Sequence, residues 1–110
     1  MLDTLNIPEV NITTLDDVTI SIGCEFDLRI VDIVKALVET NDWRTNLVDI
    51  AKGIVSGYIE DTGWEEIKKK TTKNAIERKI QKRAEEMGIE ISNFNFTDKA
   101  KSRLFKLFNN

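Results

Sequence analysis

The sequence predicts an α+β domain in which a small antiparallel sheet is covered on one face by amphipathic helices. Three observations support this fold class. Residues 18–30 place an apolar side chain at every second position, which is the pattern of a strand with one buried and one solvated face. Residues 43–60 repeat apolar side chains at helical spacing. After Gly88 the period returns to two, which predicts a second strand beside the first.

Length and composition limit the function classes. A chain of 110 residues can build one modest core, so we expect one domain over residues 1–110. The sequence contains no histidine, which removes the commonest general base and the commonest metal ligand. Its single cysteine, Cys24, falls on the apolar face of the long strand and is expected to be a buried small hydrophobe. We therefore expect a non-enzymatic protein with no cofactor and no metal.

The location expected from the sequence is cytoplasmic. No apolar run is long enough to cross a bilayer, and the acidic N-terminal segment does not have the pattern of a secretory signal. A lone cysteine suits a reducing compartment. Peripheral contact with a membrane surface stays open.

Charge is distributed unevenly along the chain. Residues 1–63 contain 4 Lys/Arg and 12 Asp/Glu, a net charge of −8, whereas residues 64–110 contain 12 and 7, a net charge of +5; the two sum to −3. This asymmetry would allow head-to-tail stacking of copies. The alternative is that the helices simply carry solvated charge.

The N-terminal elements are expected to form a hairpin and a short helix. Residues 1–9 are interpreted as an extended entry segment, because Pro8 restricts the residue before it. A short strand over residues 10–13 would then turn at residues 15–17 into the long strand. Asp32 is expected to cap a helix over residues 33–39 that has Ile33, Ala36 and Leu37 on one side.

Residues 43–60 form the most regular predicted helix. Gly53 and Gly57 lie inside it, four residues apart. Because glycine costs a helix about 1 kcal/mol, we expect close backbone packing at these positions. The predicted buried stripe consists of Leu47, Ile50, Ala51, Ile54, Val55, Tyr58 and Ile59.

The next helical segment is expected to begin with a capping box of Thr62 and Glu65 and to run to Gly88. We expect Trp64 and Ile67 to face inward and the lysines at 68–70 to be solvated. A break is expected near residues 71–72. The stripe beyond the break consists of Ile76, Ile80, Ala84 and Met87.

The second strand changes phase along its length. Ile89 and Ile91 alternate, and Phe94 and Phe96 alternate out of phase with them. A bulge at residues 92–93 would return all four side chains to one face.

The C-terminal residues 99–110 are predicted to form a short amphipathic helix capped by Thr97 or Asp98. One side of such a helix cannot bury all of its large apolar side chains, and Phe105 falls outside the packing face. We expect this helix to dock on a protein partner or an anionic membrane surface. The alternative is that it packs back on the domain. The predicted binding residues are Lys101, Arg103, Leu104, Phe105, Lys106 and Phe108.

The order of several short motifs resembles a known family. The motifs are Thr14-Leu15-Asp16 before the long strand, Asp32 after it, Gly63-Trp64-Glu65-Glu66-Ile67, and Gly88-Ile89-Glu90-Ile91 followed by Phe94, Phe96 and Asp98. Together they cover about residues 12–98, and they resemble the later two thirds of an SPFH domain, the domain shared by stomatins, prohibitins and flotillins. The family's N-terminal hydrophobic anchor and long coiled coil have no counterpart in these 110 residues. The resemblance therefore does not carry over membrane anchoring or cage assembly.

The resemblance implies a non-enzymatic scaffold or adaptor that self-associates as a homo-oligomer, in this family often at membranes. The alternative is a small protein-binding module, for example a viral or phage accessory protein, that docks a partner through its C-terminal helix. Nucleic-acid binding by the basic residues 68–83 is disfavoured by the pI of about 5.0 and the lack of aromatic residues among these lysines.

Overall fold

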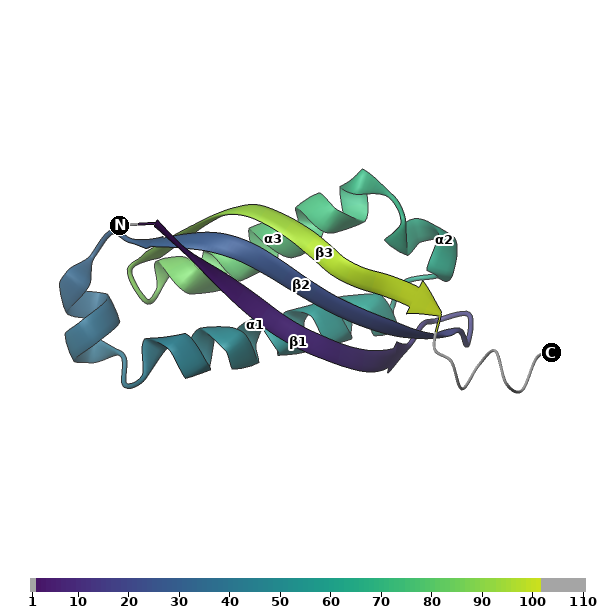
Figure 1. Cartoon of the computed structure of the whole chain (residues 1–110), viewed down its shortest axis with the longest axis horizontal. Coiled ribbons are helices and arrows are strands. Elements are labelled where there is room, and N and C mark those ends of the chain that lie inside the picture. The colour runs from purple at the N-terminus through teal and green to yellow at the C-terminus, as the bar shows by residue number, and fades with distance from the viewer. Residues whose placement is uncertain (1, 102–110) are drawn as a thin grey trace.

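A three-stranded antiparallel sheet in the order β1-β2-β3 is covered on one face by helices (Figure 1). The computed structural model describes residues 2–101, except for the side chains of residues 2, 39 and 98–101. The predicted α+β fold is confirmed. The strands are β1 (Leu2–Thr13), β2 (Thr19–Ile30) and β3 (Ile89–Lys101). The helices are η1 (Val34–Glu39), α1 (Trp43–Glu60), α2 (Trp64–Ile67) and α3 (Lys70–Glu85).

The central strand β2 supplies one wall of the core. Its alternate side chains from Ile20 to Leu28 are at most 2% exposed, as the alternation in the sequence predicts. Phe26 is fully buried, and its ring centroid lies 6.4 Å from that of Phe94 on β3. The helix side of the sheet is therefore a continuous apolar layer.

The opposite face of the sheet is polar. Asp27 on β2 accepts hydrogen bonds from Thr4 Oγ1 on β1 at 2.7 Å and from Asn93 Nδ2 on β3 at 2.8 Å. Both hydrogen bonds lower the pKa of the Asp27 carboxyl, and the one from Asn93 has the larger effect. Arg29 and Glu90 pair across β2 and β3 at 2.7 Å. Such pairs on an exposed face contribute little to stability but favour the observed register.

Strand β1 is longer than the sequence predicted. Residues 1–9 were expected to be an entry segment, but the chain pairs with β2 from Leu2, opposite Arg29. The register shifts between Ile7 and Val10, so a bulge at Pro8 and Glu9 moves the apolar side chains into a new phase. Proline is tolerated here because β1 is an edge strand.

Gly23 lies where both neighbouring strands are irregular. The β1 bulge lies opposite it, and the pairing with β3 also shifts between Gly23 and Cys24. A Cβ atom on Gly23 would lie 2.8 Å from Thr97 Oγ1 and 3.1 Å from the carbonyl oxygen of Ile7. The glycine allows the three strands to approach at this point.

Strand β3 contains the predicted bulge. Asn93 has a positive φ of 53°, and the pairing shifts between Glu25 and Asp27 of β2 opposite it. Ile89, Ile91 and Phe94 are buried and Phe96 is partly buried, so the bulge does return them to one face.

The end of β3 corrects one prediction. The strand continues to Lys101, which pairs with Ile20, so residues 99–101 are extended and do not begin a helix capped by Thr97 or Asp98. Residues 102–110 of that predicted helix lie outside the described residues.

Helix α1 has the predicted bounds, but its glycines do not pack closely. Leu47, Ala51, Val55 and Ile59 are buried against the sheet. A Cβ atom added at Gly53 or Gly57 would meet nothing within 4 Å. The expectation of close backbone packing at the glycines is therefore wrong. The predicted stripe members that are only partly buried are Ile50, Ile54 and Tyr58.

The break between α2 and α3 lies earlier than predicted, at Lys68 and Lys69. The N-cap of α2 is Gly63, and no side chain from the predicted Thr62–Glu65 capping box bonds there. The buried Thr72 donates its hydroxyl to the carbonyl of Glu66 at 2.6 Å. The buried stripe of α3 and the residues after it follows the prediction and consists of Ile76, Ile80, Ala84 and Met87.

Candidate interaction surface

The most unusual surface lies at one end of the molecule. Six large hydrophobic side chains among the described residues are exposed, and five of them belong to residues 31–38, with exposed fractions of 51–75%. Scattered exposed hydrophobic residues are ordinary, whereas contiguous ones mark interaction sites. We call this surface the apolar end; it consists of Val31, Ile33, Val34, Leu37 and Val38.

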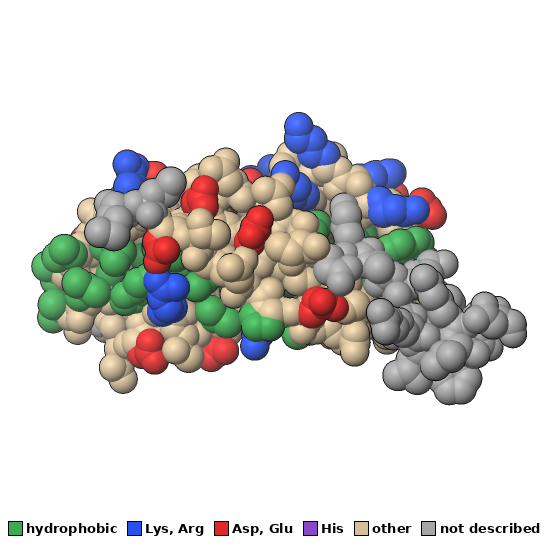
Figure 2. Space-filling view, in the orientation of Figure 1, with side chains coloured by type: hydrophobic (Ala, Val, Ile, Leu, Met, Phe, Trp, Pro, Cys, Tyr) green, Lys and Arg blue, Asp and Glu red, His purple; other side chains and the backbone are tan. Residues whose placement is uncertain are grey.

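Figures 1 and 2 show where the apolar end lies. The chain between β2 and α1 projects beyond the end of the sheet, at the left of Figure 1. Hydrophobic side chains gather at that same end of the molecule in Figure 2. Because the sheet does not extend under the whole of η1, it cannot bury the apolar side chains there.

The sequence of this segment makes exposure unavoidable. Seven of the nine residues from 30 to 38 are apolar. The helix η1 has only six residues, and among its described side chains, those of residues 34–38, only Ala36 is buried. Ile33 and Leu37, predicted to face inward with Ala36, are 63% and 56% exposed. One side of so short a helix cannot bury this number of large side chains.

Gly88 holds the apolar end in position. Its carbonyl accepts hydrogen bonds from the backbone N–H groups of Val31 at 2.9 Å and Asp32 at 3.0 Å. Gly88 has a φ of 70°, and a Cβ atom there would lie 2.5 Å from the carbonyl oxygen of Asp32. The turn after α3 therefore fixes the chain where it enters η1.

The predicted start of η1 is wrong by one residue, since the N-cap is Ile33 rather than Asp32 and the helix begins at Val34. Asp32 still contacts the first turn. Its carboxylate accepts a hydrogen bond from the N–H of Lys35 at 3.2 Å, and its carbonyl accepts one from Ala36 at 3.1 Å. Two sets of backbone hydrogen bonds, at Gly88 and at Asp32, thus order a segment whose side chains are mostly exposed.

A hollow of about 350 Å³ adjoins the apolar end. It is mostly apolar, and η1, β2 and the start of α1 contribute to it. A hollow with apolar walls and a polar edge is the usual form of a binding site for an apolar side chain. Its lining residues are Asp3, Leu28, Ile30, Ile33, Leu37 and Trp43.

Charged groups form the rim of this hollow. Arg44 makes an ion pair with Asp3 and lies over the Trp43 ring, 5.2 Å from the ring centroid. The hydrogen bond from Arg44, followed by that from the Thr4 N–H, lowers the pKa of the Asp3 carboxyl. Asp3 is therefore ionised near neutral pH and pairs with Arg44 at the edge of the hollow.

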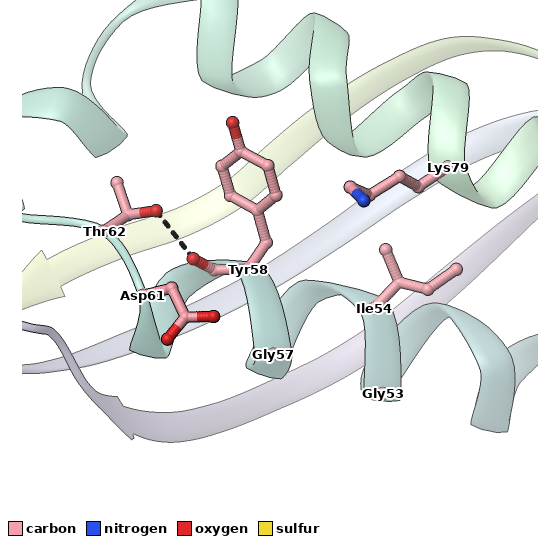
Figure 3. A pocket seen from close by; sticks show the side chains of 7 residues that line it. All are labelled: Gly53, Ile54, Gly57, Tyr58, Asp61, Thr62 and Lys79. Carbon is pink, nitrogen blue, oxygen red and sulfur yellow. Dashed lines mark hydrogen bonds between the residues drawn. The ribbon is translucent and has the colours of Figure 1, made fainter.

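A second groove lies between α1 and α3. It has a volume of about 580 Å³ and includes the open positions of Gly53 and Gly57 (Figure 3). Thr62 Oγ1 donates to the carbonyl of Tyr58 at 2.6 Å at one end of it, so this hydroxyl is already satisfied. Its other lining residues are Ile54, Asp61 and Lys79. This groove is more polar in character than the apolar end.

Within the described chain, Cys24 and the acidic side chains are the candidate groups for a nucleophile or a metal site. Burial raises the pKa of the Cys24 thiol to about 12, so the thiolate that a nucleophile requires is not formed near neutral pH. Among the side chains that the structure describes, no three His, Cys, Asp or Glu residues cluster in a way that could hold a metal ion.

Across the described part of the chain, every helix is too short or too polar to span a bilayer.

The binding residues predicted from the sequence fall at the limit of the described chain. Lys101 is the last residue of β3, and its side chain is not described. The others lie outside the described residues: Arg103, Leu104, Phe105, Lys106 and Phe108. The sequence reasoning missed the apolar end, although the apolar run at residues 30–38 carried the same signal used for residues 99–110.

No family model matches the sequence, and no curated protein matches it. The resemblance to the SPFH domain therefore stays a prediction that depends on the ordered motifs in the sequence.

Proposed function

We propose that this protein is a non-enzymatic scaffold or adaptor that self-associates, and that the apolar end is its contact surface. The observation that carries the proposal is the concentration of five exposed aliphatic side chains on residues 31–38. A surface of this kind is costly in water and is stabilised when a partner covers it. The SPFH resemblance implies self-association on separate grounds.

A protein surface suits the apolar end better than an anionic membrane. In the sequence around it, residues 29–44 contain three acidic residues, Asp32, Glu39 and Asp42, and three basic residues, Arg29, Lys35 and Arg44. Asp3 adds a carboxylate at the hollow. Anionic lipids attract clusters of four or more Lys and Arg, and the charges here are mixed instead. We place the protein in the cytoplasm, since a single buried thiol needs no oxidising compartment.

Light scattering on the full chain tests this proposal. The variant Val38→Asp puts a charge on a side chain that is 75% exposed, so the fold should be kept while association is lost. The matched control is Leu15→Asp, a 70% exposed side chain in the β1–β2 turn at the other end of the sheet. We expect a mass above one chain for the wild type and the control, and one chain for Val38→Asp.

Three results would overturn the proposal. A wild type that stays monomeric at high protein concentration shows that copies do not associate. Equal loss of association in Val38→Asp and Leu15→Asp shows that the apolar end is not the specific contact. Binding of the monomeric wild type to anionic vesicles, lost in Val38→Asp, would identify a membrane as the partner instead.

A further inference from the structure

We propose that residues 102–110 of a neighbouring copy cover the apolar end, so that copies join head to tail. This inference depends on the self-association proposed above and names the two surfaces that meet. The apolar composition of residues 102–110, their positive charge and their length all favour this pairing.

The chemistry of residues 102–110 matches the surface. The segment reads SRLFKLFNN and contains four large apolar side chains, two cations and no acidic residue. The apolar end presents aliphatic side chains beside a mostly apolar hollow of about 350 Å³, a volume that can hold an aromatic side chain. Aromatic anchors in such hollows commonly dominate the energy of protein interfaces.

Charge favours the same pairing. The apolar end belongs to the section of the chain, residues 1–63, that has a net charge of −8. The section that contains the segment, residues 64–110, has a net charge of +5. Arg103 and Lys106 would then lie near two carboxylates, Asp3 at the edge of the hollow and Asp32 before η1. Complementary charge of this kind selects partners and raises association rates.

The reach of the segment excludes its own apolar end. Lys101 pairs with Ile20, whereas Ile30, which precedes the apolar end, pairs with Ile89. The distance along β2 from Ile20 to Ile30 is about 33 Å at the rise of a strand. Nine extended residues cover about 30 Å, but Phe105 is only four residues beyond Lys101 and reaches only about 13 Å, so it cannot contact the apolar end of its own copy. Figure 1 shows the end of β3 and the η1 segment at opposite ends of the molecule.

A head-to-tail contact follows from this separation. Each copy has the apolar end at one extremity and Lys101, the last described residue, at the other, so a contact between two copies leaves one apolar end and one C-terminal segment free. Such heterologous contacts build open chains, or rings where the rotation closes. The described chain is elongated, 53 × 23 × 20 Å, so a linear array would repeat along its long axis.

Two complementary variants of the chain test this pairing. Val38→Asp retains residues 102–110 but has a disrupted apolar end. The variant that lacks residues 102–110 retains an intact apolar end but has no segment to bind it. Each alone should be a monomer by light scattering. Mixed in equal amounts, they should form a dimer of one copy of each and nothing larger, because only one intact contact is available.

A second pair of variants protects the test against misfolding. Phe105→Ser in the full chain should weaken self-association at least tenfold, whereas the neighbouring Asn109→Ser should leave it unchanged. Thermal melting of each variant shows whether the fold is kept. If the deletion variant does not fold, Phe105→Ser takes its place in the mixing experiment.

Several outcomes would overturn the inference. If the deletion variant associates as the wild type does while Val38→Asp does not, the apolar end binds another part of the neighbouring copy; the proposed function then stands and this inference fails. If the mixture of the two variants stays monomeric while the wild type associates, the inference also fails. A monomeric wild type overturns both proposals.

Discussion

The carboxylate of Asp16 accepts hydrogen bonds from the backbone N–H of Trp64 at 3.2 and 3.3 Å, across 48 residues of sequence. The first amides of a helix have no partner within the helix, so the turn between β1 and β2 caps α2 from outside. Leu15 strengthens the contact by donating its N–H to the carbonyl of Thr62 at 3.1 Å. Two of the motifs on which the SPFH resemblance is based, at residues 14–16 and 63–67, are therefore joined in space.

Replacement of Asp16 by alanine is expected to reduce the free energy of unfolding by about 1–2 kcal/mol, because it removes the acceptor at the start of α2. The matched control is Asp17→Asn. Asp17 has a φ of 64°, a conformation that asparagine also adopts, so this variant should be close to the wild type. Urea unfolding measures both. Equal stability of the Asp16 variant and the wild type would show that the long-range cap is unimportant.

Gly88→Ala is expected to cost about 2–4 kcal/mol, since the left-handed backbone and the contact with Asp32 both penalise a Cβ atom. That contact would be only 2.5 Å from the Asp32 carbonyl oxygen. The control is Gly53→Ala on α1, where a Cβ meets nothing within 4 Å. Because alanine favours helix, this control should stabilise the protein by about 0.5–1 kcal/mol. Denaturant unfolding of the two variants should thus give shifts of opposite sign, and shifts of the same sign would contradict the geometry.

Alkaline pH should destabilise the fold through Cys24. The folded thiol has a pKa of about 12 against an ordinary value of 9.0, so the unfolded state loses this proton first as the pH rises. The contribution is complete below pH 9 and is lost between about pH 9 and 12, with a slope of up to about 1.4 kcal/mol per pH unit. Cys24→Ala has no thiol at this position and shares every other titrating group, so the difference in unfolding free energy between the variant and the wild type isolates the contribution of the thiol. A difference that does not change with pH would show that the thiol is not protected by burial.

Salt should weaken self-association. The contact proposed between the acidic and basic sections of the chain gains part of its energy from charge, and salt near 1 M reduces the screening length to about 3 Å. We expect the mass measured by light scattering at fixed protein concentration to fall as salt is raised. A mass that rises with salt would indicate a contact maintained by apolar burial alone.

Local periodicity explains the parts of the fold that the sequence predicted well. The alternation at residues 18–30 and the helical spacing at 43–60 each repeat over many residues, and the structure confirms both elements. The bulge at residues 92–93 was also predictable, because it appears as a change of phase between two alternating pairs. The apolar alternation also changes phase at Pro8 and Glu9, between Ile7 and Val10. Interpreted as a bulge, this change would have predicted that β1 begins at Leu2.

What the sequence by itself determined is therefore the alternation of β2, the stripe of α1 and the order of the elements, since these depend on residues a few positions apart. Only the tertiary structure decided that Asp16 caps α2, that Gly53 faces open space, that β3 runs on to Lys101, and that residues 31–38 project beyond the sheet. Each of these depends on which segment lies opposite in space. A pattern within one segment records the period of its own backbone, but it holds no information on whether another segment covers it.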